Sequence, residues 1–245
     1  MIHFPKLFLE HTPGTVLTTD ALKSIGISPQ LAHHYVKQKW LVPIGDGAYL
    51  RQNDQPSWFG ALSTLQNSEI PVYVAAGQAL DLTGANQNII FGKPFVHLFT
   101  PHEIRLPKWF LNYDFGASFL VTRTQKYRED HLIQHTETSL QIKISRPEQA
   151  ILEVCRFVPK VYSFENLRNY MESLVSLNPT IMQELLEAEE FIKAKKLFLD
   201  MAYHIQHPWK KKLVLERINL GKGARKTVSK KHYSPARRDS APGEF

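Results

Sequence analysis

Cysteine is nearly absent from the 245-residue sequence, which contains only Cys155. This excludes an internal disulfide and any metal site built on several cysteines, and a reducing cytoplasm is the expected location. No stretch approaches the roughly 20 consecutive apolar residues that a membrane-spanning helix needs, and the N-terminus lacks the apolar run of a secretion signal. The composition, with 43% hydrophobic and 22% charged residues, is typical of an ordinary folded protein.

Acidic residues are scarce in one part of the chain. Between residues 209 and 245, 11 Lys and Arg stand against 3 Asp and Glu, whereas residues 1–208 hold 19 and 20. The net charge of +7 therefore comes from the C-terminal segment. Such a segment is either a solvated tail or a contact for phosphate groups, and the sequence leaves both interpretations open.

The sequence patterns of common catalytic and metal sites are absent. There is no HExxH pair for zinc and no GxSxG nucleophile turn, and GKGAR (221–225) lacks the spacing of a phosphate-binding loop. His131 and His135 are four residues apart, but the segment between them lacks a helical stripe. Cys155 follows Val154 on the apolar side of a predicted helix, so we expect a buried thiol. We predict no catalytic residue, no cofactor and no metal.

An enzymatic alternative stays open for the second part of the chain. A metal-dependent nuclease needs converging carboxylates near a lysine, and Asp81 with Glu103 comes nearest to that pattern. Arg105 stands where the lysine would be, and Pro101 interrupts the strand. We interpret the acidic run EAEE (187–190) as a solvated helix face. A nuclease, or an enzyme that modifies a nucleic acid or a partner protein, is therefore the second hypothesis.

Two short helices are predicted near the N-terminus. The first is capped by Thr18 or Thr19 and closed by Gly26, because glycine readily adopts the left-handed conformation found after helices. Ser28 is expected to cap the second helix, and Pro29 suits its first position, where no amide hydrogen is needed.

The second helix is amphipathic, and a hairpin is predicted after it. At about 100° per residue, its apolar positions gather on one side, which must pack on the preceding helix: Leu31, Ala32, Tyr35 and Val36. Two short apolar runs then flank Gly45-Asp46-Gly47, a sequence that favours a tight turn between antiparallel strands. Two helices followed by a hairpin predict a winged helix-turn-helix over residues 1–53.

A mixed α/β domain is predicted over residues 54–220, so the fold class is α+β. The polar segment QNDQPS (52–57) looks like a linker between the two units. Strand patterns occur at residues 71–75, 94–100, 117–123 and 139–145, and helical patterns at 57–68, 77–84, 145–158, 163–177, 179–191 and 193–207. Ser145 and Glu148 have capping-box spacing. Residues 221–245 are expected to form a flexible basic tail.

Nucleic-acid binding is the chemistry that this layout favours. The second helix of a helix-turn-helix enters the major groove with its N-terminal end first. Its polar face would meet bases and phosphates, while threonines, a wing arginine and the basic segment would contact phosphates. The predicted DNA-contacting residues are Thr18, Thr19, Ser28, Gln30, His33, His34, Lys37, Arg51, Lys210, Lys211, Lys212, Arg225 and Lys226. Because winged helices also dock proteins, and residues 1–53 carry only 5 Lys and Arg against 3 Asp and Glu, the protein-docking alternative stays open.

Several segments, in a fixed order, resemble one family. They are GTVLTTDALKSIGISPQLAHHYVKQKWLVPIGDGAYLR (14–51), W-x-x-A-L-x-x-L-Q (58–66), AAGQALDLTG (75–84), LPKWF (106–110), SRPEQAILEVC (145–155), AKKLFLDMAYHIQHPWKKKL (194–213) and INLGKGARK (218–226). The sequence is similar to AbiEi-type antitoxins of bacterial type IV toxin–antitoxin, or abortive infection, systems. The likeness covers nearly the whole chain, although SPARRDSAPGEF (234–245) departs from the expected ending.

The resemblance implies a winged-helix DNA reader followed by an antitoxin domain of α/β type. A protein of this kind is expected to be cytoplasmic and to repress its own operon by binding inverted repeats in double-stranded promoter DNA. It is also expected to counter a toxin of nucleotidyltransferase type without forming a stable complex with it. The resemblance supplies no catalytic set, and the enzymatic alternative then includes modification of the toxin.

Overall fold

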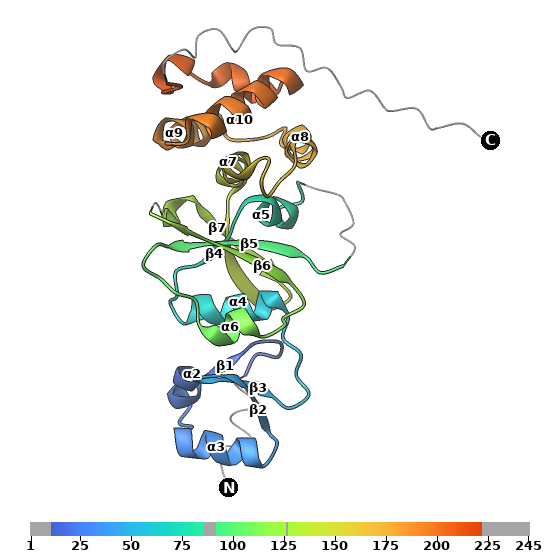
Figure 1. Ribbon diagram of the computed structural model, residues 1–245, viewed down its shortest axis with the longest axis vertical. Helices are drawn as coiled ribbons and strands as arrows, with labels where there is room; N and C mark the ends of the chain where they lie inside the picture. Colours follow the sequence, from blue (N-terminus) through green and yellow to red (C-terminus); the bar gives the residue numbers. More distant parts are fainter. Residues whose placement is uncertain (1–10, 86–91, 126, 222–245) are drawn as a thin grey trace, which may run out of the picture.

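The computed structural model describes residues 11–85, 92–125 and 127–221 (Figure 1). The described chain forms an elongated stack with the N-terminal helices at one end, a five-stranded sheet in the middle and the late helices at the other end. In the described ranges, no helix is long and apolar enough to cross a membrane.

The N-terminal unit is a winged helix-turn-helix, as predicted. Helix α2 (Thr19–Ser24) and helix α3 (Pro29–Lys37) pack on a small antiparallel sheet in the order β1-β3-β2. Its strands are β1 (Leu17–Thr18), β2 (Leu41–Gly45) and β3 (Ala48–Arg51). The hairpin is formed by β2 and β3, and the sequence did not predict β1, which is only two residues long.

The caps of both helices follow the sequence prediction. Thr18 accepts a hydrogen bond from the amide of Ala21 at 3.2 Å, and Ser28 accepts one from the amide of Leu31 at 3.2 Å. Gly26 has a φ of +82°, the left-handed conformation that lets the chain leave α2 and enter α3. These local contacts fix the angle between the two helices.

Strand β3 has apolar contacts on both faces. Ala48 and Leu50 are buried in the main core of the protein, together with residues of the five-stranded sheet. Tyr49 points the other way and packs on a smaller cluster under α2 and α3, which includes Leu22 and Tyr35. Because side chains alternate along a strand, one short strand joins the helix-turn-helix to the second unit.

The second unit contains a mixed sheet in the order β6-β5-β4-β8-β7. The β4/β8 and β5/β6 pairs are parallel, and the other two pairs are antiparallel. The strands are β4 (Tyr73–Val74), β5 (Phe95–Pro101), β6 (Ser118–Thr124), β7 (Leu132–Glu137) and β8 (Leu140–Ser145). The sequence did not predict β7, which contains His135 and follows the buried His131.

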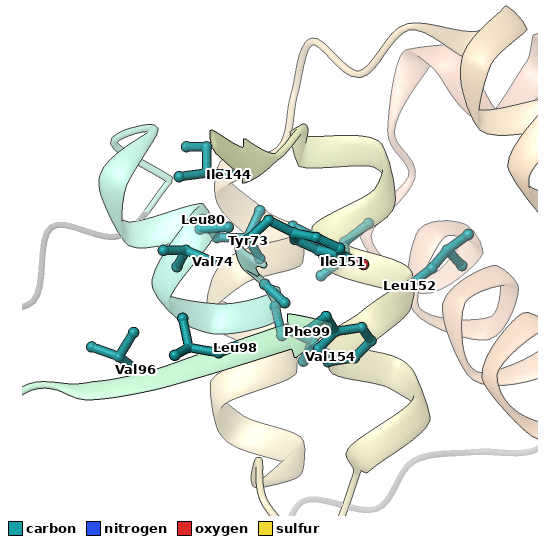
Figure 2. Packing of buried hydrophobic residues seen from close by; sticks show 14 of the residues in the cluster. Tyr73, Val74, Leu80, Val96, Leu98, Phe99, Ile144, Ile151, Leu152 and Val154 are labelled. Carbon is teal, nitrogen blue, oxygen red and sulfur yellow. The ribbon is translucent and has the colours of Figure 1, made fainter. Parts of the chain in front are cut away.

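Helices cover both faces of this sheet (Figure 1). Helices α4 (Trp58–Asn67) and α6 (Lys108–Asn112) lie on the face toward the winged helix. Helices α5 (Ala76–Leu82) and α7 (Pro147–Phe157) lie on the opposite face. Figure 2 shows side chains of α7 packed against β4 and β5, and Cys155 on this helix is buried, as predicted.

The remaining helices stack beyond α7 at the end of the molecule farthest from α3 (Figure 1). They are α8 (Phe164–Ser173), α9 (Pro179–Ala188) and α10 (Ile192–Ile205). Three 3-10 turns complete the described structure: η1 (Glu129–His131), η2 (Pro208–Lys212) and η3 (Leu215–Arg217).

The predicted capping box at the start of α7 is wrong. Helix α7 begins at Pro147 with Arg146 as its cap residue, and no side chain caps it. The Ser145 hydroxyl instead donates to the buried carboxylate of Glu153 at 2.7 Å. Glu148 accepts a hydrogen bond from the amide of Asn178 at 2.8 Å. Ser145 is the last residue of β8 and lies one position before the cap residue, so its hydroxyl bonds Glu153 and does not cap the first turn of α7.

The acidic run EAEE (187–190) is not a solvated face throughout. Glu189 is only 6% exposed, and its carboxylate accepts hydrogen bonds from Nε of Arg156 at 2.8 Å and from the amide of Phe191 at 2.8 Å. Glu187 pairs with Arg217 at 2.9 Å. The two arginines lie 33 and 30 positions away in the sequence, which is why the local pattern gave no sign of them.

The segment QNDQPS (52–57) is held in place by its acidic residue. The Asp54 carboxylate accepts hydrogen bonds from the amide of Gly14 at 3.0 Å and from the ring of His11 at 3.2 Å. Pro56 in the same segment is buried. Although the boundary at residue 53 stays a prediction, the two units share apolar packing across it.

Candidate nucleic-acid interface

The outer face of α3 presents polar side chains. Gln30, His33, His34 and Lys37 are exposed, whereas Ala32 and Tyr35 of the same helix are buried beneath them. The division follows the helical period, so packing orients the polar residues outward. Side chains of this kind can bond base edges and phosphates.

Three of the predicted DNA-contacting residues also stabilise the winged helix-turn-helix (α2, α3 and β1 to β3), which is called the head below. Thr18 and Ser28 use their hydroxyls to cap α2 and α3. Thr19 donates to the carbonyl of Gly47 through its backbone amide at 2.8 Å and through its hydroxyl at 3.1 Å. Thr19 therefore fastens the hairpin turn to the start of α2.

The end of β2, next to the hairpin turn, packs on helix α6 of the second unit. A Cβ placed on Gly45 would lie 2.8 Å from Cβ of Trp109, which is a buried side chain. Asp46, in the same turn, is exposed. The turn of this wing is therefore braced by the protein on one side, and its exposed tip is acidic.

Arg51 lies at the end of β3 and is half-buried. It is close enough to His11 to affect its ionisation. Burial lowers the pKa of His11, the hydrogen bond and charge of Asp54 oppose this, and the Arg51 charge adds to the lowering. The fold thus places Arg51 near His11 and Asp54.

The basic residues of η2 are not brought together with α3. Lys210, Lys211 and Lys212 belong to a turn anchored by Trp209, whose indole N–H donates to the Leu174 carbonyl at 2.9 Å. Figure 1 places this region at the opposite end of the molecule from α3. Arg225, Lys226 and nearly all of the predicted tail lie outside the described residues.

The residues of the nuclease hypothesis do not form a recognisable centre. Asp81 accepts a hydrogen bond from the Tyr170 hydroxyl at 3.0 Å, while Glu103 and Arg105 are exposed after β5. In the part of the chain that the structure describes, no group of three or more His, Cys, Asp or Glu could hold a metal ion.

A polar network beneath α7 was not predicted from the sequence. Glu153 is fully buried in the second unit, where its carboxylate accepts hydrogen bonds from Tyr73 at 2.9 Å, Gln149 at 2.8 Å and the amide of Ala76 at 2.9 Å. Burial raises the pKa of Glu153, while the hydrogen bonds from Gln149 and Ala76 lower it. A Gln–Glu pair four residues apart in an apolar helix was the only local signal.

A winged helix-turn-helix on a mixed α/β unit, with an exposed polar face on α3, is typical of the transcriptional-regulator class. The chain belongs to the AbiEi antitoxin family of type IV toxin–antitoxin systems. The family model for the AbiEi antitoxin N-terminal domain matches residues 2–91, and the model for the type IV AbiEi antitoxin transcriptional regulator matches residues 93–240. The resemblance seen in the sequence is therefore confirmed.

A solved structure supports the fold. The chain is similar to the crystal structure of the RV2827C protein from Mycobacterium tuberculosis, with a TM-score of 0.56 and 15% identity. The match covers 82% of this chain and 73% of that one. No curated protein matches the chain.

Proposed function

We propose that this antitoxin represses its own operon by placing α3 in the major groove of promoter DNA. The observation that supports the proposal is the polar outer face of α3, set by two capped helices on a packed base. Gln30 at the N-terminal end suits an adenine edge, His33 and His34 suit base or phosphate acceptors, and Lys37 suits a phosphate. Inverted repeats would be read by two copies of the head.

The position of the hairpin turn suggests how the affinity for DNA is divided between the turn and α3. Because the turn rests on Trp109 and its exposed residue is Asp46, the turn itself adds little attraction for phosphates. Thr18, Thr19, Ser28 and Arg51 flank α3 and are proposed to contact the DNA backbone. Recognition of sequence is then concentrated in α3.

Fluorescence anisotropy with the DNA upstream of the gene tests this assignment. The double variant His34→Ala with Lys37→Ala should weaken binding by about tenfold or more, since each good contact contributes about 1–3 kcal/mol. Lys160→Ala, in the exposed turn after α7, is the matched control and should leave affinity unchanged. Equal affinities for the double variant and the control would contradict the role of α3.

We further propose that the protein counters a nucleotidyltransferase-type toxin without forming a stable complex with it. Membership of a type IV antitoxin family supports this proposal. Co-expression of this protein with a nucleotidyltransferase-type toxin should restore the growth of cells that the toxin inhibits, and the His34→Ala with Lys37→Ala variant should restore it equally. Loss of growth rescue in that variant would show that neutralisation depends on DNA binding.

A further inference from the structure

A cavity in the second unit is not used by the proposed DNA-binding function. It has a volume of about 270 Å³ and opens between α7, the C-terminal end of α9 and the segment that precedes η1. Leu152, Leu185 and Ala188 form its apolar wall. Its polar lining includes Gln149 and Glu153 of α7, and two arginines, Arg128 and Arg156.

Glu153 fixes the orientation of the Gln149 side chain. The carboxamide nitrogen of Gln149 lies 2.8 Å from the Glu153 carboxylate and 3.1 Å from the Tyr73 hydroxyl. Tyr73 donates its own proton to Glu153 at 2.9 Å, so its oxygen is free to accept from Gln149. A carboxylate only accepts hydrogen bonds, so the nitrogen of Gln149 must face Glu153 and its oxygen must point away.

The Gln149 oxygen is a buried acceptor without a protein donor. The residue is only 8% exposed, and among the described residues Oε1 has no hydrogen-bond partner. Buried polar atoms in folded proteins are almost always hydrogen-bonded, so this oxygen calls for a donor from outside the chain. Because the residue lines the cavity, the cavity is where that donor would sit.

The other acceptors of the cavity already have donors. Glu153 accepts from Tyr73, Gln149, Ser145 at 2.7 Å and the Ala76 amide, and Glu189 accepts from Arg156 and the Phe191 amide. The two arginines of the cavity, in contrast, have more N–H donors than their protein partners use. Arg156 directs Nε and one terminal nitrogen to Glu189, and Arg128 directs one terminal nitrogen to Asp130. Each guanidinium has further N–H groups, which suit oxygen acceptors.

The backbone beneath this network is strained. Ala76 is fully buried and has a φ of +53°, a conformation that is unusual for a residue with a Cβ. Its amide donates to Glu153 at 2.9 Å. Strain of this kind is kept where surrounding contacts over-determine the geometry, and ligand sites are common among such places.

We infer that this cavity binds a small organic anion that carries a hydroxyl or N–H donor next to its carboxylate or phosphate. The anionic oxygens would accept from Arg128 and Arg156, and the donor would bond to Oε1 of Gln149. The apolar wall would take the carbon skeleton. This inference is independent of the DNA-binding proposal, because the cavity lies on the far side of the sheet from the winged helix.

Isothermal titration calorimetry of the full-length protein with two matched pairs of probes tests the inference. L-malate and succinate differ by one hydroxyl, and glycerol 3-phosphate and propyl phosphate differ by their hydroxyls. In at least one pair the hydroxyl-bearing probe should bind about tenfold more tightly, as expected for one added hydrogen bond to a buried acceptor. Failure of all four probes to bind, or equal affinity within both pairs, would overturn the inference.

Variants test whether Gln149 and Arg128 cause the preference for the hydroxyl-bearing probe. Gln149→Met keeps a similar shape and should bring the two members of the responsive pair to the same affinity. Arg128→Gln, at a partly exposed position, should weaken both members about tenfold and is the safer variant for folding. Arg168→Gln on α8 is the control and should change neither. A hydroxyl preference that survives Gln149→Met, or affinities unchanged by Arg128→Gln, would also overturn the inference.

Discussion

Gly45 and Trp109 lie in direct contact: a Cβ on the glycine would stand 2.8 Å from Cβ of the tryptophan. The glycine is the last residue of β2, next to the hairpin turn, and the tryptophan belongs to α6, beneath the five-stranded sheet. Together with Ala48 and Leu50 in the main core, this contact joins the winged helix-turn-helix to the second unit.

A side chain at Gly45 should therefore destabilise the protein. In Gly45→Val the added atoms would overlap Trp109, and we expect the free energy of unfolding to fall by about 1–3 kcal/mol. Denaturant unfolding followed by tryptophan fluorescence measures this change. Asp46→Ala in the exposed part of the same turn is the control, with an expected change within about 0.5 kcal/mol. Similar free energies of unfolding for the two variants would show that the hairpin can shift away from Trp109 without loss of stability.

His97 should make stability depend on pH. Its ring is fully buried and bonds Thr122 at 2.8 Å and Tyr162 at 3.1 Å, and burial lowers its pKa from 6.5 to about 4. Between these pH values the unfolded chain binds more protons than the folded one. The free energy of unfolding therefore falls as the pH drops through this window, by about 3 kcal/mol from this residue.

The variant His97→Gln separates this effect from the other titrating groups. It should be less stable at neutral pH, because one buried hydrogen bond is lost, but its stability should change less between pH 6.5 and 4. Urea unfolding of both proteins at several pH values gives the difference, in which contributions common to both cancel. Parallel pH profiles would contradict the neutral, buried state of His97.

The ion pair between Arg156 and Glu189 should contribute to stability as a pair. The Glu189 side chain is 2% exposed and lies 2.7 Å from a terminal nitrogen of Arg156. Arg156→Met would leave a buried carboxylate without its cation, with an expected loss of about 3 kcal/mol in thermal or denaturant unfolding. Arg168→Met removes an exposed ion pair with Glu172 and should cost at most about 1 kcal/mol. Equal losses in the two variants would argue against burial of the first pair.

The lysines of η2 should affect binding to long DNA but not binding to a short operator duplex. They lie at the opposite end of the molecule from α3, so a short duplex on α3 would not reach them. In a variant with Lys210, Lys211 and Lys212 changed to Ala, we expect unchanged affinity for a minimal operator duplex. With DNA of several hundred base pairs, the salt dependence of binding should become shallower. Weaker binding of this variant to the minimal duplex would contradict the prediction and would indicate that these lysines lie beside the operator.

The parts of the fold that depend on neighbouring residues could be predicted from the sequence. Ser28 and Pro29 start α3, Gly26 precedes it, and the glycines around Asp46 fold the hairpin, because each effect acts within a few residues. The polar face of α3 followed from the same helical period that predicts its buried side. Family membership agreed with the order of the segments along the chain.

The parts that depend on distant partners could not be predicted. Ser145 has the spacing of a cap, but it ends β8, and its hydroxyl bonds Glu153 inside α7. Glu189 looks like a surface residue until Arg156, 33 positions earlier, is placed beside it. The two-residue strand β1 and the contact of Gly45 with Trp109 also exist only once the chain has folded. A single sequence contains no local signal for such pairings.

Strand β3 packs on the helices with one face and on the main core with the other, so the head and the late helices sit at fixed ends of one body. An operator-bound copy would then hold α8, α9 and α10 at a constant height above the double helix, facing away from it. Any molecule that docks on those helices would be carried to the promoter at a set distance, and two copies on an inverted repeat would present a pair of such platforms.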